Sequence, residues 1–86
     1  MNVLLPTPLV AYTAGEREVD AAGTTLDSVL FDLDRQYPGI RFRIIDEQGR
    51  VRPHIKLFVD RVLERDLTRP VLEANELLVV AALSGG

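Results

Sequence analysis

One amphipathic stripe in the middle of the chain restricts the possible folds more than any other feature. Apolar residues recur at i, i+3, i+4, i+7 and i+11 from Leu26 to Tyr37, which is the spacing of one helix face. Thr24 or Thr25 is placed to cap its N-terminus, and Pro38 follows its end. The pattern predicts a helix that buries one side against a partner layer.

Short segments of strand character surround this stripe, and they predict that the partner layer is a sheet. Each has apolar alternation or a short apolar run bounded by turn residues. The predicted strands are Val3–Leu5, Arg17–Ala21, Arg41–Ile44, His54–Asp60 and Leu77–Leu83. The last is apolar on both faces, as expected for a central strand or for one whose outer face binds a partner.

This element order predicts an α+β chain with a β-grasp (ubiquitin-like) fold, in which one main helix crosses one face of a mixed sheet. The domain is expected over residues 1–83 and a C-terminal tail over 84–86. Since one helix covers only one face, the other is expected to be a binding surface. Alternation places Phe58 on that face, and we predict a partner-binding surface that contains Phe58 and Leu83.

Composition excludes several classes of protein. The 86 residues include no cysteine, so disulfides, CxxC redox pairs and iron–sulfur clusters are excluded and apolar packing must hold the core. No apolar run is long enough to span a membrane, and no export signal is evident, so a cytoplasmic location is expected. The net charge of −3 argues against nucleic acid as the main partner.

Catalytic and metal-binding patterns are weak. His54 is the single histidine, and without cysteine it has no evident nucleophile or metal-ligand partner. Asp27, Asp32 and Asp34 lie on the polar side of the helix, where a solvated face is favoured over an acid/base pair. No catalytic residue, metal or cofactor is predicted.

The segment 41–52 carries four arginines. As a strand it would project Arg41 and Arg43 from one side and place Phe42 in the core. A phosphate-binding stripe is one interpretation, but a solvated or acid-pairing face is favoured, and an acidic enzyme surface would suit it.

The C-terminus is the most distinctive chemical feature. Gly85-Gly86 follows the apolar strand with only Ser84 between. Two residues without side chains make a thin tether that can enter a narrow active-site channel and deliver the α-carboxylate of Gly86. An activating enzyme could adenylate this carboxylate, and a sulfur donor could convert it to a thiocarboxylate. A frayed end is the alternative interpretation.

These residues together resemble the ThiS/MoaD family of ubiquitin-like sulfur carriers over essentially the whole chain. The matching segments are Leu5–Leu9 with Tyr12–Gly15, Thr25–Leu33 with Tyr37–Ile40, His54–Asp60, and Leu77–Gly86. The resemblance implies a monomeric carrier, not an enzyme, which serves an adenylating enzyme and a sulfur-accepting biosynthetic enzyme. Within the family, the long Arg41–Arg52 connection looks closest to that of carriers that serve cysteine-type amino-acid biosynthesis. Molybdopterin carriers remain an alternative, and the shorter thiamine carriers look less similar.

The sequence departs from the family pattern at two turns and leaves two other functions open. Asp60 replaces the usual turn residue after Phe58-Val59, and Asn75 is predicted to supply the positive φ before the last strand. A ubiquitin-like modifier joined through Gly86 to lysines would use the same adenylation. An interaction module that never reacts is the third possibility.

Overall fold

The computed structural model describes residues 1–82; residues 83–86 lie outside the described part. The elements in chain order are β1 (Asn2–Leu4), the 3-10 helix η1 (Thr7–Thr13), β2 (Glu18–Asp20), α1 (Leu26–Gln36), α2 (Ile40–Ile44), β3 (Ile55–Val59), β4 (Val62–Leu63) and β5 (Glu76–Ala81). No helix within these 82 residues is both long and apolar enough to cross a membrane.

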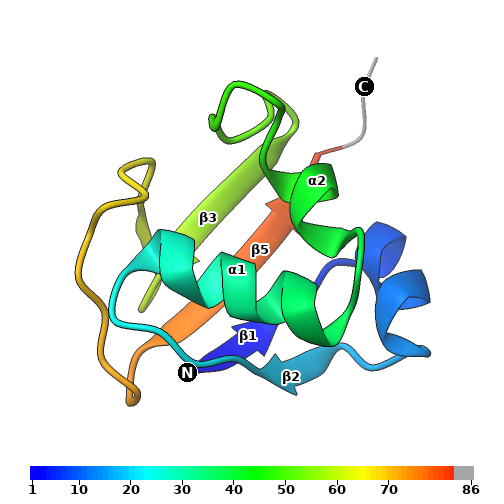
Figure 1. Ribbon diagram of the computed structural model, residues 1–86, viewed down its shortest axis with the longest axis horizontal. Helices are drawn as coiled ribbons and strands as arrows, with labels where there is room; N and C mark the ends of the chain where they lie inside the picture. Colours follow the sequence, from blue (N-terminus) through cyan, green and yellow to red (C-terminus); the bar gives the residue numbers. More distant parts are fainter. Residues whose placement is uncertain (83–86) are drawn as a thin grey trace.

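Within the described residues the strands form one mixed sheet in the order β2-β1-β5-β3-β4. Strands β1 and β2 form an antiparallel hairpin, β5 runs parallel to β1, and β5 runs antiparallel to β3. Figure 1 shows α1 across one side of this sheet, with α2 on the same side. The predicted β-grasp fold is confirmed, and the last strand is central as expected.

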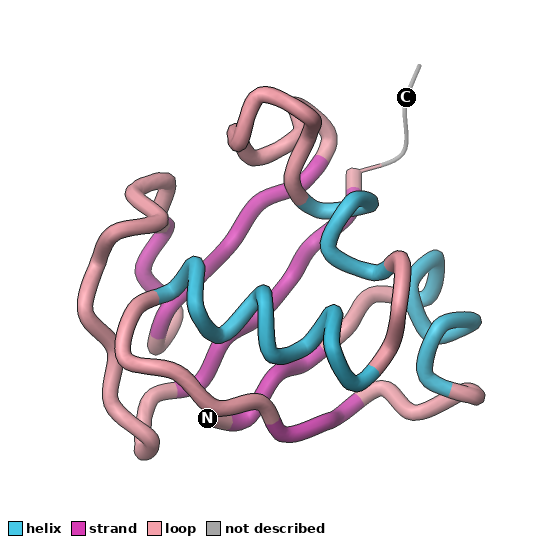
Figure 2. The backbone as a smooth tube through the Cα atoms, viewed as in Figure 1, coloured by secondary structure: helices cyan, strands magenta, loops and turns pink. Residues whose placement is uncertain are grey.

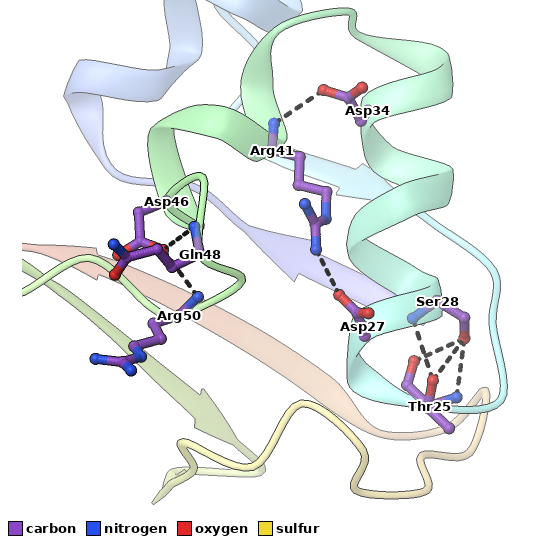
Figure 3. A network of polar contacts seen from close by, with 8 residues as sticks. All are labelled: Thr25, Asp27, Ser28, Asp34, Arg41, Asp46, Gln48 and Arg50. Atoms are coloured by element: carbon purple, nitrogen blue, oxygen red, sulfur yellow. Dashed lines mark hydrogen bonds and ion pairs between the residues drawn. The ribbon is translucent and has the colours of Figure 1, made fainter.

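The main helix α1 matches its prediction closely. Thr25 is its N-cap: the Thr25 hydroxyl accepts a hydrogen bond from the Ser28 N–H at 3.2 Å, and the Ser28 hydroxyl accepts one from the Thr25 N–H at 2.9 Å (Figure 3). This reciprocal capping box satisfies two N–H groups that the first turn leaves without helical partners. The buried stripe consists of Leu26, Val29, Leu30 and Leu33.

The strand predicted at 41–44 is wrong, because this segment forms the helix α2. Gly39, at a φ of +98°, turns the chain after α1, and Ile40 and Ile44 then both lie fully buried at i, i+4 spacing. Phe42 was predicted to be buried in the core but is 56% exposed. Four residues of alternating polarity fit the period of a helix as well as that of a strand, and in this protein tertiary packing selects the helix.

Three smaller features also differ from the sequence interpretation. Neither η1 nor the short strand β4 was predicted. Asn75 does not have a positive φ; Asp60 and Arg61 do, at +48° and +71°, between β3 and β4. Positive φ at two successive residues is the pattern of a tight hairpin turn. Asn75 instead uses its side chain, which accepts from the Leu72 N–H and donates to Asp60, both at 2.6 Å.

Candidate functional site

The base of the C-terminal tail is held in the centre of the sheet. β5 pairs with β3 as far as Ala81, and the Ala82 N–H donates a hydrogen bond to the His54 carbonyl at 2.8 Å. In Figure 1 this end of β5 lies near α2. The predicted tail residues Leu83, Ser84, Gly85 and Gly86 lie outside the described residues.

Phe58 lies on the sheet face opposite α1, as the alternation predicted. Its neighbours on β3, Leu57 and Val59, are fully buried in the core, whereas Phe58 is only half-buried. The burial alternates along this strand because successive side chains point to opposite faces of the sheet. The placement is therefore confirmed; the role of Phe58 in binding a partner stays a prediction.

Phe58 belongs to a continuous row of apolar side chains that we call the apolar row. The row follows directly paired positions across four strands: Leu4, Leu78, Phe58 and Leu63. Paired residues share a face, so the four side chains line one surface. Leu63 is 43% exposed, and the other three are half-buried. Apolar surface of this kind, uncovered by any element within residues 1–82, is typical of interaction sites.

Charged and polar residues border the apolar row. Glu18 faces Leu4 on β2 and accepts a hydrogen bond from the Asn2 amide at 2.7 Å. Lys56 lies opposite Val80, two residues from Phe58 towards the tail end of the sheet. An apolar centre with a polar rim is the usual anatomy of a protein–protein interface.

A hollow of about 730 Å³ opens at the end of β5, and we call it the tail-base hollow. It is bordered by η1, α2, the residues before β3 and the end of β5, so segments far apart in sequence meet there (Figures 1 and 2). Its lining residues are Pro8, Leu9, Ala11, Tyr12, Phe42, Arg43, Arg52, His54, Ile55, Ala81 and Ala82. None of these carries a carboxylate.

Two arginines of the hollow are held in place by aromatic residues. The Arg43 Nε donates to the Tyr12 hydroxyl at 2.6 Å, and the Arg43 guanidinium lies 6.0 Å from the Tyr12 ring centre. The Arg52 Nε donates to the Phe42 carbonyl at 2.6 Å, and its guanidinium lies 4.5 Å from the Phe42 ring centre. Each arginine is thus fixed through Nε and a cation–π contact.

The position of α2, and hence of Arg43, depends on contacts with α1. The Asp34 carboxylate accepts hydrogen bonds from the N–H groups of Gly39 and Arg41 at 3.1 and 3.0 Å. The Arg41 side chain reaches back to Asp27 at 2.9 Å and lies 4.0 Å from the Phe31 ring centre (Figure 3). Arg41 and Arg43 therefore point to different partners, whereas the predicted strand had placed them on one side.

The aspartates of α1 hold the structure together and do not form an acid/base pair. Asp32 accepts a hydrogen bond from the Ala22 N–H at 2.8 Å, and that bond, helped by Arg35 and Gln36, holds the pKa of Asp32 below its usual value. Asp27 and Asp34 are engaged with α2 as described. His54 is exposed, and no metal-ligating group of three or more residues occurs in residues 1–82.

Sequence reasoning missed the Tyr12–Arg43 and Phe42–Arg52 pairs. Both depend on α2, because a strand at 41–44 would have buried Phe42 and turned Arg43 away from η1. The available signal was the spacing of Ile40 and Ile44, which fits a helical turn as well as the alternation fits a strand.

Similarity to known proteins agrees with the fold. No model of a known protein family matches the sequence. The chain is 29% identical to the sulfur carrier protein CysO of Mycobacterium tuberculosis, over 100% of this chain and 98% of that protein.

Solved structures give the same result. A chain in the crystal structure of the Amycolatopsis orientalis BexX/CysO complex matches with a TM-score of 0.89 and 27% identity, covering 99% and 98% of the two chains. SAMP1 from Haloferax volcanii matches with a TM-score of 0.79 and 26% identity, covering 100% and 98%.

The fold, the central last strand and the full-length similarity define a ubiquitin-like protein of the sulfur-carrier class. The predicted resemblance to ThiS/MoaD-type carriers is confirmed in that the chain is similar over its full length to the sulfur carrier protein CysO.

Proposed function

We propose that this sulfur carrier holds its sulfur as a thiocarboxylate on Gly86, delivered by the tail Ser84-Gly85-Gly86. An adenylating enzyme would join the Gly86 carboxylate to AMP and release pyrophosphate from ATP. A sulfur donor would then displace AMP and leave sulfur on the carbonyl carbon. The observation that carries the proposal is that β5, the central strand, ends at Ala81 on the rim of the sheet, four residues before a diglycine terminus.

The experiment compares the full chain with a chain that lacks Gly86. After incubation with an activating enzyme, ATP and a sulfur source, intact-mass spectrometry should show the mass gain of one oxygen replaced by sulfur only in the full chain. Replacing Gly85 with a bulky residue should have the same effect as the deletion, because the tether then no longer fits a narrow channel. Equal charging of the deleted chain would refute the proposal.

The body of the carrier would be bound through the apolar row. Leu4, Leu78, Phe58 and Leu63 form the surface, and the tail starts from the same sheet, so an enzyme that covers the row has the terminus within reach. In this proposal the adenylating enzyme and the sulfur-accepting enzyme bind the apolar row one after the other. The BexX/CysO complex, in which a similar protein is assembled with a second one, supports the part of this proposal that a partner protein is bound.

The similarity to CysO favours cysteine-type biosynthesis over molybdopterin or thiamine as the destination of the sulfur. In this proposal the chain is a carrier and not an enzyme, and the free protein is a monomer. Because activation consumes ATP, the proposed location is the cytoplasm.

Conjugation to proteins is the second candidate, and the similarity to SAMP1, a small archaeal modifier protein, favours it. Both functions begin with the same adenylation. Denaturing electrophoresis in the presence of the activating enzyme separates them, because only a modifier gives products of higher mass that resist reduction. Lys56 is the single lysine, so chains of the modifier would have one side-chain attachment point.

A further inference from the structure

A second hollow, of about 420 Å³, lies at the β4 edge of the sheet, and we call it the basic hollow. It is bordered by the segment that leads into β3, by the first residues of β3 and by the end of β4 with the residues after it. Its wall carries one carboxylate, that of Glu64, and four cationic side chains, those of Arg50, Arg52, Lys56 and Arg65. Positive charge is thus concentrated here in a chain whose net charge is −3.

The single carboxylate of the wall is already engaged. One oxygen of Glu64 lies 3.5 Å from the Arg69 Nε, and the other accepts hydrogen bonds from the N–H groups of Arg65 and Asp66, both at 3.1 Å. Among residues 1–82, none of the four cationic side chains of the hollow has a carboxylate oxygen within 4 Å. The chain therefore leaves this positive charge without a close counter-charge.

Asp46, the acid beside the hollow, is occupied as well. Its carboxylate accepts hydrogen bonds from the N–H groups of Gln48 and Arg50 at 2.9 and 3.0 Å and closes the turn before β3 (Figure 3). These bonds, with weaker attraction from the side chains of Arg52 and Arg50, hold the pKa of Asp46 below its usual value. Asp46 is committed to the turn and forms no ion pair with either arginine.

The basic hollow is continuous with the apolar row. Leu63, the last member of the row, also lines the hollow. Lys56 lines it too, and Lys56 lies on the same sheet face as Phe58 because the two are two residues apart in β3. A partner that covers the row from Leu4 to Leu63 therefore reaches the hollow without leaving that face.

The two ends of the apolar row carry opposite charge. At the β2 end, Glu18 lies directly opposite Leu4 and is exposed. At the β4 end, Leu63 adjoins the exposed side chains of Lys56 and Arg65. Charges placed around an apolar centre steer the encounter of two proteins and fix their relative orientation. Only a partner with its negative charge at the β4 end matches this pattern.

We propose that the basic hollow binds an acidic segment of the adenylating enzyme, while the apolar row binds an adjoining apolar surface of the same enzyme. The occupant is a protein segment and not a free anion, because the hollow opens onto apolar surface that an anion alone would leave uncovered. The unneutralised cations, the continuity of the hollow with the row and the opposite charges at the two ends of the row carry this inference. It rests on the proposed function, and it names the charge of the partner and its orientation on the sheet.

The test measures association of the chain with the activating enzyme that charges it, by stopped flow or surface plasmon resonance at several salt concentrations. Lys56→Glu and Arg65→Glu should each slow association at least about fivefold at low ionic strength, because each places a negative charge where the enzyme brings its own. Each should also reduce the dependence of the association rate on salt. Circular dichroism checks that both variants fold.

The matched control is Arg17→Glu, which changes the net charge by the same amount at an exposed position that does not line the hollow. It should not slow association. Equal slowing by Arg17→Glu would show that only the net charge matters, and an unchanged rate in both hollow variants would show that the enzyme does not use the hollow. Either result would overturn the inference.

A second arm separates a protein segment from a free anion. Inorganic phosphate should slow association no more than sodium chloride does at equal ionic strength. Stronger inhibition by phosphate, lost in Arg65→Glu, would make the hollow a site for small anions and overturn the inference. The proposed function is judged separately by the unmodified chain: if charging proceeds while the hollow variants bind normally, only the assignment of the hollow fails.

Discussion

The two faces of the sheet are built from the same strands, yet they differ sharply in burial. On the helix side, Val3, Leu57 and Leu77 have no exposed surface, whereas on the opposite side Leu4, Phe58 and Leu78 are only half-buried. A single layer of helices accounts for the difference, because it covers one face and leaves the other as the apolar row. The same strands therefore carry the fully buried core on one side and the partly exposed apolar row, the proposed binding surface, on the other.

The largest effect is expected on the helix side. Leu30 is fully buried in the middle of the α1 stripe, so Leu30→Ala should cost about 2–5 kcal/mol of unfolding free energy through lost burial and the cavity left behind. Chemical denaturation measures this cost. The matched variant on the open face, Leu78→Ala, should cost less than half as much, and equal costs would contradict the division between the two faces.

A substitution on the open face of the sheet tests binding to the activating enzyme. Phe58→Asp should preserve the fold, because Phe58 is outside the helix-side core, but it should weaken binding to the activating enzyme at least tenfold, or about 1.4 kcal/mol. Titration calorimetry gives the affinity and circular dichroism checks the fold.

Phe31→Asp is the control for this substitution, since Phe31 is a 56% exposed aromatic on α1. The affinity of the Phe31→Asp variant for the activating enzyme should stay near that of the unmodified protein. An unchanged affinity of the Phe58→Asp variant would show that Phe58 is not part of the interface. An unfolded Phe58→Asp variant would show that Phe58 belongs to the core.

A smaller effect is expected at the start of α1. Thr25→Ala removes the hydroxyl that accepts from the Ser28 N–H and should cost about 1 kcal/mol of stability without changing partner affinity. Thr24→Ala, one residue earlier and exposed, is the matched control and should be nearly neutral. Denaturation midpoints compare the two, and equal losses would show that Thr25 does not act as the cap.

The smallest effect concerns pH. The folded structure lowers the pKa of Asp32, chiefly through the Ala22 N–H, so this carboxylate adds stability that is present above its unfolded pKa of about 4. That contribution is lost as the pH falls from about 4 through the folded pKa. Asp32→Asn should therefore flatten the decline of the denaturation midpoint in acid, and an identical acid decline in both proteins would exclude the contribution.

Local patterns were sufficient for much of this molecule. The stripe from Leu26 to Tyr37, the alternation in β3 and the apolar last strand predicted the main helix, the side on which Phe58 lies and the central position of β5. The stripe and the alternation are each long enough to show a period, whereas the last strand has no period and was predicted from the length of its run and its apolar residues on both faces. Gly85-Gly86, on which the proposed thiocarboxylate chemistry rests, is likewise read from the sequence alone.

Tertiary structure decided the regions where the pattern was short or ambiguous. Residues 40–44 form a helix because the turn at Gly39 and the hydrogen bonds that the Gly39 and Arg41 N–H groups donate to Asp34 set the direction of the chain. Ile40 and Ile44 are both buried in that form. That choice exposes Phe42, sends Arg41 to Asp27 and brings Arg43 to Tyr12. The tail-base hollow follows from it, because its walls come from four separate segments whose proximity no local period encodes.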